Sequence, residues 1–275
     1  MKLNRSVLVQ VLTTLVLSIS FVTISNAACT SITSLPYAIS SSGSYCLTGN
    51  RSVNTQTNTN TYVGAITVSA DDVTLDLGGF EIKNTNSDPL TNLYTVGVLS
   101  MGPHSNITIK NGRINGYGTG LYLYGRDGAI YNSIIENITI YNFATDSIRV
   151  NNGFKCIIRN SKVFGHSGIE SRGIEVSGDY NSVIDNEVKE VVYGITASGS
   201  RNIVDNNRVT GSELAMQTDG ARGIHIDYDG FAVNNRINSF NVGINSLPGA
   251  KYRDNLTINC TTPYTGWGTD AGNNN

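Results

Sequence analysis

A short sequence unit recurs along the chain and limits the folds that it can adopt. The unit is Gly-Ile-x-aliphatic, or a close variant, and an Asn follows it; from Ser147 onward the interval to that Asn is 12 or 13 residues. The units begin at Gly64, Gly97, Gly120, Ser147, Gly173, Gly194, Gly223 and Gly243. The Asn partners are Asn111, Asn137, Asn160, Asn186, Asn207, Asn235 and Asn255. From Gly97 the units start 20 to 29 residues apart. A nearly constant arc joined to a variable loop is typical of a solenoid, in which each unit is one coil.

Within each unit the apolar residues alternate over short runs, as in GIEV and VTLDL. This period of two predicts short strands, and no segment after residue 27 has a sustained helical stripe. Each unit therefore holds two or three strands, and like strands of successive units stack in parallel. The pattern predicts an all-β fold, a single-chain right-handed parallel β-helix with roughly eight or more coils. Asn side chains at equivalent turns are expected to form ladders.

The segment AITVSADDVTLDLGGFEI, followed by NITIKNGRI and the later units, resembles the pectate-lyase-like superfamily of right-handed parallel β-helix proteins. It is most similar to exported members with right-handed β-helix repeats. The resemblance covers nearly all of the chain after residue 27, and the matching residues are core and turn positions. It implies the fold, but the superfamily contains polysaccharide lyases, hydrolases, epimerases, esterases, tailspikes and a periplasmic copper-delivery family. The fold alone does not choose among these activities.

The first residues have the features of an export signal. Two basic residues precede an apolar stretch over 7–24, and small residues follow at 25–27. We expect a secreted or periplasmic protein with no membrane span after cleavage; a permanent anchor is the weaker alternative, because polar residues interrupt the stretch. The predicted division of the chain is a signal peptide at 1–27, an N-terminal cap at 28–63, β-helix repeats at 64–258 and a C-terminal cap or tail at 259–275.

The cysteines suggest one disulfide. Export permits disulfides, and Cys29 and Cys46 flank a short Ser- and Gly-rich segment near the expected mature N-terminus, so we expect them to pair. Closing such a loop contributes about 3 kcal/mol in the chain-entropy model. Cys156 lies in an apolar run and is expected to be a buried small hydrophobe.

Composition excludes some partners. The 275 residues include 19 Lys and Arg against 21 Asp and Glu, spread evenly along the sequence, so no basic stripe is available to a phosphate backbone. We expect no nucleic-acid partner. Asn occurs 33 times and charged residues make up only 15% of the chain, which favours turns and strands over helices. Nothing in the sequence specifies an oligomeric state.

One strand of each unit is expected to carry an exposed ladder of side chains. If Ile174 and Val176 point inward, Glu175 and Ser177 point outward, and the same parity applies to every unit. The rungs are then Leu99; Tyr122 with Tyr124; Arg149 with Asn151; Glu175 with Ser177; Thr196 with Ser198; His225 with Asp227; and Asn245. The strip combines aromatic, cationic, acidic and hydroxyl groups.

Three variable loops, at about 84–96, 164–172 and 211–222, precede this strand and are expected to wall a groove over it. A flat strip of such side chains between loops suits a polysaccharide, whose hydroxyls need hydrogen-bond partners and whose ring faces stack on Tyr. The expected substrate-binding residues are Tyr122, Tyr124, Arg149 and Glu175. The main hypothesis is a carbohydrate-binding or cell-surface structural protein.

The alternative is a polysaccharide lyase or epimerase that acts on uronates. An Arg would neutralise the substrate carboxylate, and His225 or a Tyr would remove the adjacent proton. The candidate catalytic residues are His225, Arg222, Arg172 and Asp227. The structural alternative is a solvated strand face with ordinary ion pairs, including one between Arg222 and Asp227. Hydrolysis is less favoured, because Glu175 and Asp227 are expected two rungs, or about 10 Å, apart.

Metal binding has little support in the sequence. A periplasmic copper-delivery protein is the third hypothesis, but the His and Met residues are scattered over different units. Asp71, Asp72 and Asp76 could bind calcium, yet they match the turn and strand pattern of a β-helix. We therefore expect no metal site and no cofactor.

Overall fold

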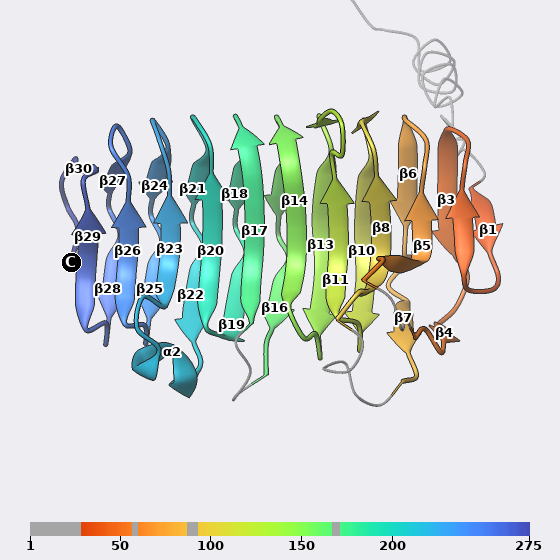
Figure 1. Ribbon diagram of the computed structural model, residues 1–275, viewed down its shortest axis with the longest axis horizontal. Helices are drawn as coiled ribbons and strands as arrows, with labels where there is room; N and C mark the ends of the chain where they lie inside the picture. The colour runs from red at the N-terminus through yellow and green to blue at the C-terminus, as the bar shows by residue number, and fades with distance from the viewer. Residues whose placement is uncertain (1–28, 57–59, 87–92, 167–170) are drawn as a thin grey trace, which may run out of the picture.

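The computed structural model describes residues 29–56, 60–86, 93–166 and 171–275. These residues wind into a right-handed parallel β-helix, which confirms the predicted fold class. In Figure 1 the strands follow one another in chain order along the long axis of the molecule, from the N-terminal to the C-terminal coils. No helix among the described residues is long and apolar enough to cross a membrane.

One wall of the β-helix, sheet B, is formed by the strand that opens each repeat unit. All of its pairings are parallel. Its main path is β2 (Tyr37–Ile39), β5 (Val63–Val68), β8 (Thr95–Met101), β11 (Thr119–Tyr124), β14 (Asp146–Phe154), β17 (Arg172–Asp179), β20 (Tyr193–Ser198), β23 (Arg222–Ile226), β26 (Val242–Ser246) and β29 (Thr262–Gly266). Two short strands, β9 (His104–Ser105) and β12 (Ile130–Tyr131), extend it at one side.

The rest of each coil belongs to sheet A, which has two columns of strands. The first column holds β1 (Thr30–Ile32), β3 (Gly43–Leu47), β6 (Val73–Asp76), β15 (Ile157–Arg159), β18 (Ser182–Ile184), β21 (Ile203–Asp205), β24 (Phe231–Val233), β27 (Lys251–Arg253) and β30 (Thr269–Asp270). The second holds β4 (Arg51–Val53), β7 (Glu81–Asn84), β16 (Lys162–Phe164), β19 (Glu187–Val191), β22 (Arg208–Gly211), β25 (Arg236–Asn238) and β28 (Leu256–Ile258). The long strands β10 (Thr108–Asn115) and β13 (Ile134–Tyr141) take part in both columns.

The core consists of stacked aliphatic side chains. On the inner face of sheet B the strand register aligns Val98, Leu121, Ile148, Ile174, Ile195, Ile224 and Ile244. Each is at most 1% exposed. Burying one such side chain contributes roughly 1.5–3 kcal/mol. The alternation of the sequence therefore sets which side chains of sheet B face outward.

The glycine that opens most of the units marks a close approach between neighbouring coils. A Cβ atom on Gly120 would lie 2.6 Å from the Ser147 carbonyl oxygen and 2.6 Å from Cγ2 of Ile140. Both distances are well inside van der Waals contact, so a side chain would push the coils apart. This crowding explains why most units begin with Gly, while the small residue Ser147 takes the position in one of them.

Asparagine occupies two adjacent positions at one corner of the coils. The first position is left-handed, a conformation that Asn and Asp tolerate better than most residues; Asn160 has φ 51° and Asp185 has φ 57°. The repeat pattern predicted one series that joins Asn111, Asn137 and Asn160 with Asn186. That assignment was wrong by one residue, because the first three occupy the left-handed corner and Asn186 follows it.

The second position holds a buried ladder of carboxamides. Nδ2 of Asn207 donates to Oδ1 of Asn235 over 3.0 Å, and Oδ1 of Asn207 accepts from Nδ2 of Asn186 over 3.1 Å. The ladder consists of Asn186, Asn207, Asn235, Asn255 and Asn274. Its side chains also bond the backbone of neighbouring coils, as in the 2.8 Å bond from Asn207 Nδ2 to the Val183 carbonyl. The ladder therefore ties the C-terminal coils together.

The two predicted cap segments contain strands of the β-helix. Strands β1 to β4 pair in parallel with one another or with β5, β6 and β7, and β29 and β30 pair with β26 and β27. The predicted disulfide is confirmed: Cys29 and Cys46 are bonded, with Cα atoms 5.7 Å apart. Cys156 is a buried free thiol, as predicted. The export signal at 1–27 lies outside the described residues and stays a prediction.

A short helix, α2 (Glu213–Gln217), follows β22 and was not expected from the sequence. It lies in the loop at 211–222, ahead of β23. The other two predicted groove loops, at 84–96 and 164–172, lie only partly within the described residues.

Candidate functional site

The outer face of sheet B carries the predicted ladder of side chains, but Leu99, Tyr122 and His225 are buried and not exposed as predicted. Because the strands are parallel and in register, equivalent residues of successive coils lie side by side, about 4.8 Å apart. This first column consists of Leu99, Tyr122, Arg149, Glu175, Thr196, His225 and Asn245. A linear ligand parallel to the solenoid axis would meet these side chains in turn.

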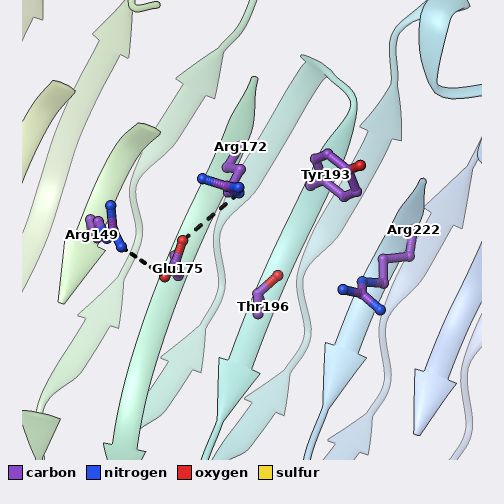
Figure 2. Close-up of a pocket in the computed structure, with 6 residues that line it drawn as sticks. All are labelled: Arg149, Arg172, Glu175, Tyr193, Thr196 and Arg222. Atoms are coloured by element: carbon purple, nitrogen blue, oxygen red, sulfur yellow. Dashed lines mark ion pairs between the residues drawn. The ribbon is translucent and has the colours of Figure 1, made fainter. Parts of the chain in front are cut away.

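A second column lies three residues earlier in each strand. It contains Thr119, Asp146, Arg172 and Tyr193 in register, and Arg222 opens β23 at the equivalent position. The two columns together line a pocket of about 340 Å³ on the sheet face. Its lining residues are Arg149, Arg172, Glu175, Tyr193, Thr196 and Arg222, which Figure 2 shows on adjacent strands. The pocket is therefore polar and rich in arginine.

Glu175 lies between two arginines of this pocket (Figure 2). Its Oε1 is 3.5 Å from Nη2 of Arg149, and its Oε2 is 3.9 Å from Nε of Arg172. Burial raises the pKa of Glu175 and the charge of Asp146 adds to the increase, which together outweigh the lowering effect of the two arginines. A carboxyl group with a raised pKa exchanges protons closer to neutral pH than an ordinary Glu does.

Asp146 is a second carboxylate at this site and is only 2% exposed. Its Oδ2 lies 3.6 Å from Nη1 of Arg149, and its Oδ1 lies 3.6 Å from Nη1 of Arg172. These separations are longer than those of direct charge-assisted hydrogen bonds. Among the described residues, Oδ1 of Asp146 has no hydrogen-bond partner. Asp146 thus holds both guanidinium groups in place electrostatically. Nε of Arg149 donates to Oδ1 of Asn151 over 3.4 Å, while the terminal Nη groups of both arginines stay available to another acceptor.

Arg222 differs from the other two arginines of the pocket. Within the described part of the chain it makes no ion pair, and its buried Nε has no hydrogen-bond partner. The suggestion that it pairs with Asp227 is wrong, because Asp227 contacts His225 instead. An unpaired guanidinium beside two others is electrostatically unfavourable, and a bound anion would relieve this.

His225 and Asp227 form a separate cluster one rung beyond Thr196. Nδ1 of His225 is 2.7 Å from Oδ1 of Asn245, and Nε2 is 2.7 Å from Oδ1 of Asp227. Burial raises the pKa of Asp227, but hydrogen bonding and the charge of His225 outweigh it, so the pKa lies below its usual value. Both ring nitrogens of His225 thus have protein partners.

Tyrosines lie at the other end of the pocket. The Tyr122 ring is 5.0 Å from that of Tyr62 and stacks on that of Tyr124 at 5.5 Å, and Tyr62 also contacts Tyr94 at 5.3 Å. Tyr122 is 3% exposed, and burial raises its pKa to about 12. The Arg149 guanidinium lies 5.2 Å from the centre of its ring, so Tyr122 supports this arginine. The substrate contacts of Tyr122 and Tyr124 stay predictions.

The structure brings together only part of the residue set that the sequence singled out. Arg149, Arg172, Glu175 and Arg222 meet at one pocket, whereas His225 with Asp227 and Tyr122 with Tyr124 flank it on opposite sides. Sequence reasoning missed Asp146 and Tyr193 in the second column. The signal was present, because both occupy the strand position that Arg172 and Arg222 hold in their own coils. Tyr62 and Tyr94 precede their strands, and no periodicity pointed to them.

The acidic residues considered for calcium make local contacts. Oδ1 of Asp71 accepts from the Ser105 backbone at 2.8 Å, Oδ1 of Asp72 accepts from the Asn106 side chain at 2.7 Å, and Oδ1 of Asp76 accepts from the Gly78 backbone at 2.8 Å. Within the described ranges no group of three or more His, Cys, Asp or Glu side chains could hold a metal ion.

Comparisons with known proteins agree with the fold. No protein-family model matches the chain, and no curated protein matches it by sequence. Among solved structures, the chain is similar to the A-module of the Azotobacter vinelandii mannuronan C-5 epimerase AlgE6, with a TM-score of 0.45 and 11% identity over 85% of this chain and 91% of that one. It is also similar to pectate lyase Pel9A, with a TM-score of 0.56 and 11% identity over 84% of this chain and 69% of that one. The chain therefore shares the right-handed parallel β-helix fold of pectate lyase Pel9A.

Proposed function

We propose that this protein binds an acidic polysaccharide along the outer face of sheet B, with uronate carboxylates held at the arginine pocket. The observation that carries the proposal is the unpaired guanidinium of Arg222, which lines the same pocket as Arg149 and Arg172. Arginine binds carboxylates through two parallel hydrogen bonds, and its planar fork suits this better than lysine does. Export to the periplasm or the exterior, where such polymers occur, is part of the proposal.

The linear arrangement of the site supports a polymer over a small molecule. Polar side chains follow one another on successive strands from Tyr124 to Asn245, along the axis of the solenoid. The pocket occupies the middle of this strip, between the tyrosines and the His225 cluster. A chain molecule lying on the strip can contact arginines at the pocket and hydroxyl or amide groups on both sides.

Affinity electrophoresis and calorimetry with polygalacturonate, alginate and a neutral glucan test the proposal. We expect the wild type to retain the acidic polymers only, with weaker binding at higher salt because the contacts are ionic. Arg172→Gln/Arg222→Gln should bind about tenfold more weakly or worse. Arg126→Gln, which changes an exposed arginine in a turn, is the matched control and should bind normally. Equal retention of neutral and acidic polymers, or full binding by the double variant, would contradict the proposal.

A second candidate function is a lyase or epimerase acting on uronates, and the raised pKa of Glu175 favours it. Both reactions begin with removal of the proton next to the substrate carboxylate. We propose Arg172 and Arg222 as the groups that neutralise this carboxylate and Glu175 as the base, in place of His225, whose ring nitrogens already have partners. In elimination, the C–H electrons form the new double bond, the glycosidic C–O bond breaks, and the leaving oxygen takes a proton from water.

Two assays separate this candidate from binding alone. Elimination creates an unsaturated uronate that absorbs in the ultraviolet, and epimerisation in D₂O places deuterium on the inverted carbon. Glu175→Gln should abolish either signal while the variant still binds polymer. The absence of both signals with every acidic polymer would remove the enzymatic candidate and leave the binding function standing.

A further inference from the structure

A second basic groove lies on sheet A, away from the pocket of sheet B. Arg208 on β22 and Arg236 on β25 are direct partners in the parallel register, so their side chains leave neighbouring strands side by side. Both are exposed. Among the residues that the structure describes, neither forms an ion pair. Like charges directly opposite each other destabilise a sheet, so packing alone does not explain this arrangement.

The nearest acidic side chain in the column is already neutralised. Glu187 lies beside Arg208 in the register, but its carboxylate contacts Lys189 and lies 4.0 Å from Lys162. The hydrogen bond from Lys189 is the main reason why the pKa of Glu187 lies below its usual value. Arg236 has an apolar neighbour, Leu256, on its other side. Glu187 also interacts electrostatically with Arg208, but its carboxylate is shared with two lysines, so among the described residues neither arginine has an acid in direct contact.

Hydrogen-bonding groups surround the arginine pair. A groove of about 520 Å³ is lined by Arg208, Thr210, Arg236, Ile237, Asn238, Ile258 and Asn259. Nδ2 of Asn259 donates to Oδ1 of Asn238 over 3.2 Å, which leaves the Asn238 amide nitrogen and the Asn259 carbonyl oxygen for a ligand. Ile258 is 42% exposed and gives the groove one apolar side. Cationic, hydroxyl, amide and apolar surfaces thus meet in one groove.

We propose that this groove is a second binding site, for an acidic sugar residue. Arg208 and Arg236 would hold its oxyanion, and Thr210, Asn238 and Asn259 would hydrogen-bond its hydroxyls. The oxyanion is a carboxylate or a sulfate ester, both of which accept paired hydrogen bonds from guanidinium groups. The site uses a different sheet and different residues from the pocket of sheet B, so it goes beyond the function proposed above and does not depend on it.

Calorimetry on a variant that lacks the first site isolates the second. Arg172→Gln/Arg222→Gln is titrated with a galacturonate trimer, a sulfated neutral trisaccharide and the same trisaccharide without sulfate. We expect it to bind at least one of the charged trimers and not the neutral one. Adding Arg208→Gln/Arg236→Gln should weaken that binding about tenfold or more. Arg208→Lys/Arg236→Lys, which keeps the charge but not the planar fork, should lie between the two. The charged trimer that binds identifies the oxyanion.

The matched control is Arg126→Gln in the same background, which should leave affinity unchanged. Thermal unfolding verifies that the sheet A variant is folded; removal of two like charges should leave its Tm unchanged or slightly higher. Equal affinity with and without Arg208 and Arg236, or no binding of either charged trimer, would overturn the second site. Failure of the first site has a different signature, because Arg172→Gln/Arg222→Gln would then bind polymer as the wild type does.

Discussion

Two polar regions of this β-helix differ in whether their hydrogen-bonding groups have partners within the protein. In the carboxamide ladder, Asn207 donates to one neighbouring Asn, accepts from another and bonds the backbone of Val183. In the pocket on sheet B, by contrast, Oδ1 of Asp146 and Nε of Arg222 have no hydrogen-bond partner among the described residues. Both regions are built from repeated strands, but only the ladder satisfies itself.

This difference distinguishes polar groups that stabilise the fold from polar groups that are available to a ligand. A buried polar group without a partner costs about 1–3 kcal/mol unless a ligand or an ordered water completes it. The ladder stabilises the coils, whereas the pocket keeps charged donors available. Substitutions should therefore affect mainly stability in the ladder and mainly binding in the pocket.

The largest expected effect on stability comes from the ladder itself. Asn207→Ala leaves the polar groups of Asn186 and Asn235 without their partner, and we expect a loss of about 2–4 kcal/mol in the free energy of unfolding. Urea denaturation measures it. Asn206→Gly is the matched control, since Gly keeps the left-handed corner conformation, and it should change stability by less than about 1 kcal/mol. Equal losses in the two variants would remove the distinction between corner and ladder.

A smaller effect is expected at Gly120, where two neighbouring coils approach closely. Gly120→Ala places a methyl group 2.6 Å from the Ser147 carbonyl oxygen, so the coils must shift. We expect a loss of about 1–3 kcal/mol, typical of overpacking, measured as a lower urea midpoint with an unchanged m-value. In Gly79→Ala the added Cβ has open space around it, but the backbone has a positive φ, so this variant tests for backbone strain without crowding. A neutral Gly120→Ala variant would show that the coils adjust freely there.

The ionisation of Glu175 in the pocket should make the free energy of unfolding depend on pH. The native pKa of Glu175 is raised, so the native state binds more protons than the unfolded state between the ordinary Glu value and the native one. Stability from this group therefore falls as pH rises through that window. Glu175→Gln should abolish the fall and leave the protein within about 1 kcal/mol of the wild type at neutral pH. A steep loss of stability in Glu175→Gln at neutral pH would mean that its ion pairs are structural.

For Asp227 we expect the opposite dependence of stability on pH, which serves as an internal comparison. Its native pKa is lowered, so its contribution is present above the ordinary Asp value and lost as pH falls through the native pKa. Asp227→Asn should therefore flatten the acid side of the stability profile, measured by urea denaturation between pH 2 and 5, about the range of carboxyl titration. An unchanged acid profile would contradict the role of the His225 contact.

The smallest effect on stability is expected at Arg222. Because it makes no ion pair with a described residue and its buried Nε has no hydrogen-bond partner, Arg222→Gln should leave the free energy of unfolding unchanged or slightly higher while it weakens binding of acidic polymer. Arg149→Gln is the comparison, since it also breaks contacts with Asp146 and Glu175. A variant of Arg222 that unfolds as readily as Asn207→Ala would place this arginine among the structural residues.

The sequence predicted the fold and the outer ladder because both follow from a period of two imposed by a packed core. Parity placed Arg149, Glu175, Thr196 and His225 in one column, and the register agrees. One pairing was predicted wrongly although parity decides it. Asp227, which directly follows β23, pairs with His225 two residues earlier and not with Arg222, because alternate residues share a face. The Asn series was offset by one residue because two adjacent positions both favour Asn. The first has a left-handed backbone, and the second holds the carboxamide ladder.

The most direct test of the central claim compares an acidic oligouronide with a neutral oligosaccharide of the same length, for the wild type and for Arg222→Gln, by calorimetry. If the unpaired guanidinium is kept for a carboxylate, the wild type prefers the acidic ligand and the variant loses most of that preference, about tenfold, with a urea midpoint no lower than that of the wild type. If the wild type shows no preference, or the variant keeps it in full, the pocket on sheet B is not a carboxylate site.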